Sequence, residues 1–212
     1  MPETTHTSLS GPAGDLEVML TMPHQAYQSV AILCHPHPLY GGSMHDGVLQ
    51  LAANSLLQQE IAVIRFNFRG VGNSQGISGQ GSAEEKAHQQ YLPPEVGDLL
   101  AITAWARSSY DSIPLVYLGY SFGAHVLWHA LPLLNDDQAL LIAPPSAAMV
   151  FETQNLQRAA GLHAVWCEGD DFVDPSRFTE DTNVTTTQLA GGDHFFSNQT
   201  HGLATAVQSV FG

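Results

Sequence analysis

The feature that most constrains the fold is the alternation of short apolar runs with longer amphipathic ones. The sequence predicts a hairpin over residues 5–10 and 16–22. Apolar residues at helical spacing then predict helices at 46–59, 95–107 and 122–134, a short helix from 175, and a last helix near 196–211. The strand-like runs lie at 30–34 (VAILC), 61–66, 115–119, 139–143, 162–167 and 184–189. This order indicates an α/β fold with a mostly parallel sheet, whose sites lie at the carboxyl ends of the strands. The glycine-rich segment 70–94 predicts a long loop, with a helical turn near 84–88.

The charge balance excludes several classes of partner. The 212 residues include 20 acidic and 6 basic ones, which gives a formal net charge of -14. Nucleic acids and anionic membranes both require clustered Lys and Arg, so we expect neither as a partner. The length predicts a single domain over 1–212, as a monomer or homodimer. Two cysteines and no signal sequence favour a cytoplasmic protein with reduced thiols.

The pattern G-x-S-x-G, typical of a nucleophilic serine, occurs twice, around Ser74 and around Ser121. The chemistry requires a sharp turn from a strand into a helix, which lifts the hydroxyl above the sheet. Ser121 follows the apolar run PLVYLGY and precedes the helical run FGAHVLWHALPLL, whereas Ser74 runs into ISGQGS. We therefore expect Ser121 to be the nucleophile; the alternative is that it only caps the helix.

A serine nucleophile needs a base, and the base needs an acid that orients it. His194 lies in a glycine-rich loop between the last strand and the last helix, which favours it as the base. The acid is expected just after the strand 162–167, where Asp170, Asp171 and Asp174 compete. Asp174 precedes a proline and could instead cap a helix. Spacing alone does not choose between Asp170 and Asp171.

Two histidine pairs have spacings that a metal site could use. His125 and His129 are four residues apart on a predicted helix, and His35 and His37 form an H-x-H pattern. No third ligand is apparent for the helical pair, and alternating prolines explain the H-x-H segment as a rigid loop. We therefore expect neither a metal nor a cofactor.

These motifs together resemble the α/β-hydrolase superfamily, and more narrowly its small lidless bacterial branch related to dienelactone hydrolases. The resemblance rests on four segments in the family's order: HPHPLYGG at 35–42, RFNFRGVGNSQG at 65–76, GYSFGA at 119–124 and DHFF at 193–196. It implies a twisted eight-stranded sheet flanked by helices, without a large cap domain, and a serine hydrolase. It also places Ser74 in the loop after the fourth strand. The family's D-x-x-V pattern favours Asp170 as the acid, although Cys167 stands where the family has glycine.

Acyl transfer also needs two N–H donors for the oxyanion. One is expected from Phe122, at the start of the helix, and the other from the loop after the third strand. Pro36 and Pro38 have no N–H, so the second donor is among His37, Leu39 and Tyr40. The family's loop pattern implies His37.

The site is expected to be an open, apolar cleft. The segment 144–161 between two predicted strands is too short for a helical cap. The residues expected to line the cleft are apolar or aromatic, namely Tyr40, Met44, Phe172 and Phe195.

The leading interpretation is a serine hydrolase for a small carboxylic ester or thioester. Lactone or C–C bond hydrolysis, or a perhydrolase, would use the same triad, and a binding protein on the same fold is a further alternative. The acidic residues around 170–174 and Asp193 are expected to stabilise a transient imidazolium and to disfavour anionic substrates.

Overall fold

A single mixed sheet of eight strands forms the centre of the computed structural model, which describes residues 2–81, 92–135, 137–151, 161–178 and 183–212. The strands follow the order β1-β2-β4-β3-β5-β6-β7-β8. Their bounds are β1 Glu3–Gly11, β2 Gly14–Met22, β3 Ser29–Cys34, β4 Ile61–Phe66, β5 Leu115–Tyr120, β6 Ala139–Ile142, β7 Leu162–Cys167 and β8 Val184–Leu189. β2 pairs antiparallel with β1 and β4, and the other pairs are parallel. The predicted α/β class is confirmed.

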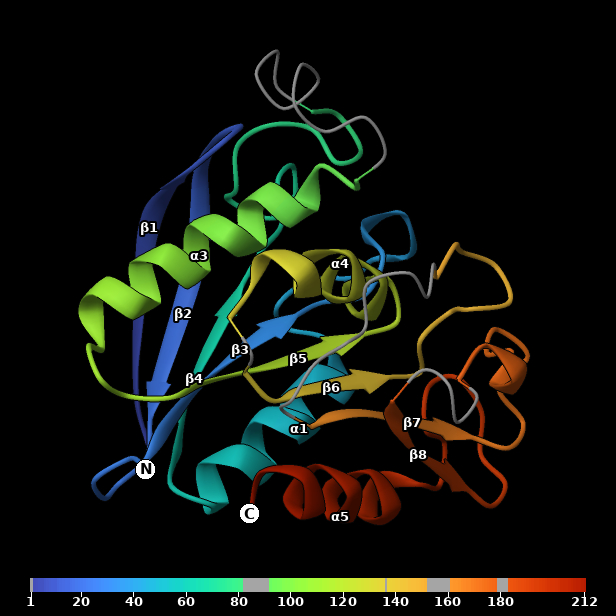
Figure 1. Cartoon of the computed structure of the whole chain (residues 1–212). Helices are drawn as coiled ribbons and strands as arrows, with labels where there is room; N and C mark the ends of the chain where they lie inside the picture. The colour runs from blue at the N-terminus through green and yellow to red at the C-terminus, as the bar shows by residue number, and fades with distance from the viewer. Residues whose placement is uncertain (1, 82–91, 136, 152–160, 179–182) are drawn as a thin grey trace.

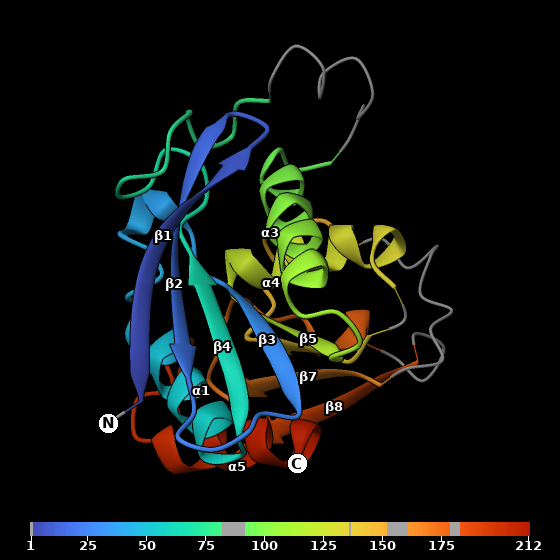
Figure 2. The same ribbon diagram turned by 90° about the vertical axis from the view of Figure 1, so that its left-hand side faces the viewer.

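Helices cover both faces of the sheet (Figures 1 and 2). α3 (Glu95–Ser109) and α4 (Phe122–Ala130) pack on one face, while α1 (Gly47–Gln58) and α5 (Thr200–Phe211) pack on the other. The side chains of β3 alternate between the two cores, as strand geometry requires. β4 and β5 are buried along their whole length, which explains their continuous apolar sequences. The described residues include no helical cap domain.

Two helix boundaries differ from the prediction. α4 ends at Ala130, and a 3-10 turn, Leu131–Leu133, follows it. Pro132 explains the early end, because proline lacks the N–H that would continue the helix. α5 begins only at Thr200, since Phe196 and Asn198 adopt positive φ angles of 57° and 61°. The helical turn expected near 84–88 lies outside the described residues.

A buried ion pair fastens the loop after β4 to α3. The Arg69 guanidinium donates to the Asp98 carboxylate over distances of 2.7–3.1 Å, and both side chains are fully buried. The Arg69 backbone N–H also donates to Asp98 Oδ2 at 2.9 Å. One helical turn earlier, the Glu95 carboxylate accepts from the Ser78 hydroxyl and the Gly79 N–H. α3 thus holds the loop from two points.

We expect Asp98→Asn to lower the free energy of unfolding by about 3–5 kcal/mol, because it leaves the Arg69 charge buried and uncompensated. Urea unfolding followed by circular dichroism measures this loss. The control is Arg177→Met, which breaks an exposed pair with Asp174 at 3.5 Å and should cost less than about 1 kcal/mol. Equal losses of unfolding free energy in the two variants would contradict the conclusion that Asp98 compensates a buried charge on Arg69.

Candidate active site

Ser121 occupies a strained turn between β5 and α4. Its φ of 53° and ψ of -117° lie outside the regions that non-glycine residues usually adopt. The turn is possible because the residues two positions before and after Ser121, Gly119 and Gly123, lack side chains. A Cβ on Gly119 would lie 2.4 Å from the Gly123 carbonyl oxygen, and one on Gly123 would lie 2.2 Å from the Cys34 oxygen. This is the strand–turn–helix context that the motif predicts.

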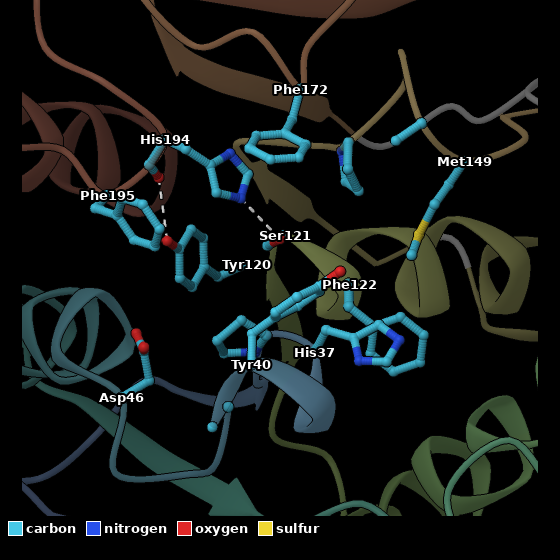
Figure 3. A pocket seen from close by; sticks show the side chains of 15 residues that line it. His37, Tyr40, Asp46, Tyr120, Ser121, Phe122, Met149, Phe172, His194 and Phe195 are labelled. Atoms are coloured by element: carbon cyan, nitrogen blue, oxygen red, sulfur yellow. Dashed lines mark hydrogen bonds between the residues drawn. The ribbon is translucent and has the colours of Figure 1, made fainter.

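Ser121, His194 and Asp170 are joined in sequence by hydrogen bonds, and Figure 3 shows the bond between His194 and Ser121. His194 Nδ1 lies 2.8 Å from Asp170 Oδ2 and 3.0 Å from Oδ1. The carboxylate therefore fixes the tautomer with the proton on Nδ1. His194 Nε2, 2.9 Å from Ser121 Oγ, is then the acceptor of the hydroxyl proton. Ser121 makes no side-chain capping bond to α4, so the alternative that it only caps the helix does not describe its contacts.

The three competing aspartates after β7 have different environments. Asp170 is fully buried at its side chain and contacts the imidazole. Asp174 instead caps the 3-10 turn Pro175–Arg177, where its Oδ1 accepts from the N–H and hydroxyl of Ser176. These bonds lower the pKa of Asp174. Asp171 is exposed. The structure thus brings Asp170, and not the other two, to the histidine.

The loop that carries His194 is fixed from both sides. The Asp193 carboxylate accepts from the backbone N–H groups of Phe195 and Ser197, each at 3.0 Å. These bonds lower the pKa of Asp193. On the opposite side, the Tyr120 hydroxyl donates to the His194 carbonyl at 3.1 Å. Asp193 therefore shapes the loop rather than contacting the imidazole.

The loop after β3 leaves one of its three candidate amides available. The Leu39 N–H donates to His37 Nδ1, and the Tyr40 N–H donates to the His37 carbonyl, both at 3.1 Å. The His37 N–H has no acceptor among the described residues, and neither has the Phe122 N–H. The ring centroids of His37 and Phe122 lie 4.6 Å apart, so the loop after β3 packs against the start of α4.

His35 holds the loop after β3 through hydrogen bonds of both its ring nitrogens. Its Nδ1 donates to the Pro36 carbonyl at 2.7 Å, and its Nε2 accepts from the Phe68 N–H at 3.0 Å. Burial lowers the pKa of His35 to about 4, so the ring is neutral at physiological pH. Because both nitrogens are committed, His35 and His37 do not form a metal pair in this structure.

The second histidine pair is bonded to itself. The Nε2 atoms of His125 and His129 lie 3.1 Å apart, and His129 Nε2 also contacts the Val150 carbonyl. Burial lowers the pKa of His125 to about 4. Within the described ranges, no group of three or more His, Cys, Asp or Glu side chains is placed to hold a metal ion.

The second serine motif has a structural role. The Ser74 hydroxyl donates to the Asn67 carbonyl at 2.7 Å and accepts from the Glu17 N–H at 2.9 Å. Asn67 in turn donates to the Glu17 carboxylate at 2.7 Å. Ser74 thus joins the loop after β4 to β2, away from the imidazole.

A pocket with a volume of about 330 Å³ opens above Ser121 (Figure 3). It is largely apolar and contains Tyr40, Phe172 and Phe195 as expected. The residues that line it are Pro36, His37, Tyr40, Gly41, Gly42, Asp46, Tyr120, Ser121, Phe122, Pro145, Ala148, Met149, Phe172, His194 and Phe195.

The expectation that Met44 lines the pocket is wrong. Met44 is fully buried and lies outside the lining. Its N–H donates to Asn67 Oδ1 at 2.8 Å and its carbonyl accepts from Arg65, so the backbone is held against the loop after β4. Met149 also lines the pocket, which no local pattern predicts, because it reaches the surroundings of Ser121 only through the folding of the segment after β6. Asp46, where the sequence predicts only the beginning of a helix, lines the pocket as well.

Gly123→Ala is expected to destabilise the protein by about 1–3 kcal/mol and to disturb the turn, because the new methyl group would overlap the Cys34 carbonyl. Gly47→Ala is the matched control. Gly47 is the first residue of α1, and a Cβ there meets nothing within 4 Å. This change should stabilise the helix by a few tenths to about 1 kcal/mol. Thermal unfolding compares the stability of the two variants. If Gly123→Ala were as stable as the wild type, the predicted overlap with the Cys34 carbonyl would be contradicted.

His35 gives a pH dependence of stability. Its pKa is about 4 in the folded protein and 6.5 in an ordinary histidine, so its contribution is complete above pH 6.5 and is lost as the pH falls toward 4. The contribution should change by at most about 1.4 kcal/mol per pH unit. Urea unfolding between pH 6.5 and 5 measures the slope. We expect His35→Gln to reduce this slope of unfolding free energy against pH, and His6→Gln, on the exposed strand β1, to leave the slope unchanged. An unchanged slope in His35→Gln would show that His35 is not its origin.

Known proteins resemble this chain over nearly its whole length. The family model described as serine aminopeptidase, S33, matches residues 28–169. An α/β serine hydrolase without a lid from Xanthomonas campestris is 31% identical, with a TM-score of 0.83 over 98% of this chain and 93% of that one. An α/β serine hydrolase homologue from Coxiella burnetii is 28% identical, with a TM-score of 0.83 over 98% and 97%.

A more distant likeness concerns the fold alone. A dienelactone hydrolase from Anabaena variabilis is 14% identical, with a TM-score of 0.71 over 99% of this chain and 97% of that one. The family model, by contrast, covers more than half of the chain, and it includes the turn around Ser121. The chain is therefore an α/β hydrolase and belongs to the family described as serine aminopeptidase, S33.

Proposed function

We propose that this hydrolase cleaves a small carboxylic ester or thioester through an acyl-enzyme intermediate. The observation that carries the proposal is a pair of hydrogen bonds that share the His194 ring. Ser121 Oγ lies 2.9 Å from His194 Nε2, and His194 Nδ1 lies 2.8 Å from Asp170 Oδ2. Ser121 and His194 both line a largely apolar pocket. A hydroxyl bonded to an oriented neutral imidazole is the arrangement that nucleophilic catalysis by serine requires.

In the first half-reaction, Ser121 Oγ attacks the acyl carbon while His194 Nε2 accepts the hydroxyl proton. The Asp170 carboxylate stabilises the imidazolium that results. The Phe122 and His37 N–H groups donate to the oxyanion, since neither has another acceptor among the described residues. Collapse of the tetrahedral intermediate breaks the bond to the leaving oxygen or sulfur, which takes the proton from His194 Nε2.

Water completes the second half-reaction. It attacks the acyl carbon of the ester on Ser121, and His194 Nε2 accepts a proton from it. When this second tetrahedral intermediate collapses, Ser121 Oγ leaves and recovers the proton from His194. The products are a carboxylic acid and the alcohol or thiol released earlier, and the enzyme returns to its starting state.

The pocket supports a small-molecule substrate. Its volume of about 330 Å³ is near the lower end of the range for ligand sites, and most of its lining is apolar. Its rim is open, because Tyr40 is 90% exposed and Phe195 69% exposed. No described helix is long and apolar enough to cross a membrane. The unpaired buried thiols of Cys34 and Cys167 support a cytoplasmic location as part of the proposal.

Ser121→Ala should abolish labelling by a fluorophosphonate and reduce kcat/KM for nitrophenyl esters of short acids by about 10⁴-fold or more. Ser74→Ala is the matched control, because it changes the same residue type in the same motif. We expect Ser74→Ala to keep both labelling and turnover. Mass spectrometry of the labelled peptide identifies the modified serine.

Two results would contradict the proposed function. Labelling that survives in Ser121→Ala would show that another residue is the nucleophile. Absence of turnover by the wild-type protein over esters and thioesters of graded acyl length would instead favour a binding protein on this fold.

A further inference from the structure

Asp46 places a carboxylate in the lining of the pocket. It is the N-cap of α1, and its Oδ1 accepts from the N–H groups of Val48 at 2.8 Å and Leu49 at 3.1 Å. Its other carboxylate oxygen, Oδ2, accepts from none of the described residues. One oxygen of Asp46 is therefore committed to the helix, while the other is available to a ligand in the pocket.

The pocket lining contains no arginine or lysine to balance this charge. The four arginines within the described ranges have partners elsewhere. Arg65 donates to the Gln50 side chain and the Met44 carbonyl, and the other three pair with aspartates, namely Arg69 with Asp98, Arg107 with Asp137 and Arg177 with Asp174. A negative charge is thus built into the described lining without a compensating cation.

The charge lies at one end of the pocket. Figure 3 shows Asp46 and Met149 on opposite sides of Ser121, with Tyr120 and Phe195 on the Asp46 side. Burial, and then the negative charge of Asp46, raise the pKa of the Tyr120 phenol. On the other side, Met149 belongs to an apolar turn, because its N–H and that of Ala148 both donate to the Pro145 carbonyl, and all three residues line the pocket. The scissile bond at Ser121 would therefore lie between an acidic end and an apolar end.

We propose that Asp46 determines substrate specificity. The pocket takes esters that are apolar on one side of the scissile bond and carry a cation, or less favourably a neutral hydrogen-bond donor, on the other side. It disfavours esters that carry a carboxylate or a phosphate at that end. The inference rests on the proposed function, because it uses the position of Ser121 to divide the substrate into two parts.

The test compares matched esters in which a quaternary nitrogen is replaced by carbon, so that only the charge changes. One pair carries the group in the alcohol half and a second pair carries it in the acyl half. We expect the wild type to prefer the cationic member of at least one pair by about tenfold in kcat/KM, which corresponds to about 1.4 kcal/mol. A matched carboxylate ester should be the poorest substrate.

Asp46→Asn should bring this preference close to unity. Asparagine caps helices about as well as aspartate, so the midpoint of thermal unfolding should change little. Asp171→Asn removes the same charge from an exposed residue beside Phe172 that does not line the pocket, and it should keep the preference. Added salt should weaken the preference of the wild type.

The inference would be overturned if the wild type showed no preference in either pair, or if Asp46→Asn kept it. An equal loss in Asp171→Asn would assign the effect to the general field of the protein, which also overturns it. A pair of phosphonates with cationic and neutral leaving groups separates this result from failure of the proposed function. If no ester is hydrolysed, the rates at which the pair labels Ser121 still test Asp46.

Discussion

The contact between the backbone of Gly123 and the carbonyl of Cys34 determines the geometry of the site. A side chain at Gly123 would lie 2.2 Å from that oxygen, so α4 can approach the end of β3 only with glycine there. This approach goes with the strained turn at Ser121, after which the Phe122 N–H has no acceptor among the described residues. It also lets the Phe122 ring pack against His37, so that the two segments that carry the available amides are held together.

Several ionisable groups around this contact have structural roles, and this separates them from the groups proposed for catalysis. His35 is neutral because it is buried, and its two nitrogens hold the loop that carries His37. Asp193 holds the loop of His194 through two backbone N–H groups. Asp170, in contrast, directs its carboxylate at the imidazole. Most of the negative charge near the site is therefore engaged in local hydrogen bonds, whereas Asp46 lines the pocket and has one carboxylate oxygen without a partner among the described residues.

Much of this arrangement could be predicted from local patterns. The strand before Ser121 and the helix after it are both visible in the sequence, so the strand–turn–helix geometry at Ser121 could be predicted. The same reasoning rejected Ser74, whose hydroxyl holds a loop. The position of Met44 could not be predicted, because its apolar character suits a pocket lining and a fully buried position equally well. The position of Met149 could not be predicted either, because no local pattern links the segment after β6 to Ser121.

The sequence by itself determined the α/β class, the order of strands and helices, and the turn at Ser121, since these depend on periodicity and on residues adjacent in the chain. Only the tertiary structure decided which of Asp170, Asp171 and Asp174 contacts the imidazole, and which amide near His37 is left without an acceptor. It also decided that Asp46, at which a predicted helix begins, lines the pocket. These outcomes depend on distances between segments far apart in the chain, which the parallel pairing of β3 with β5 and the close packing of α4 on β3 fix together.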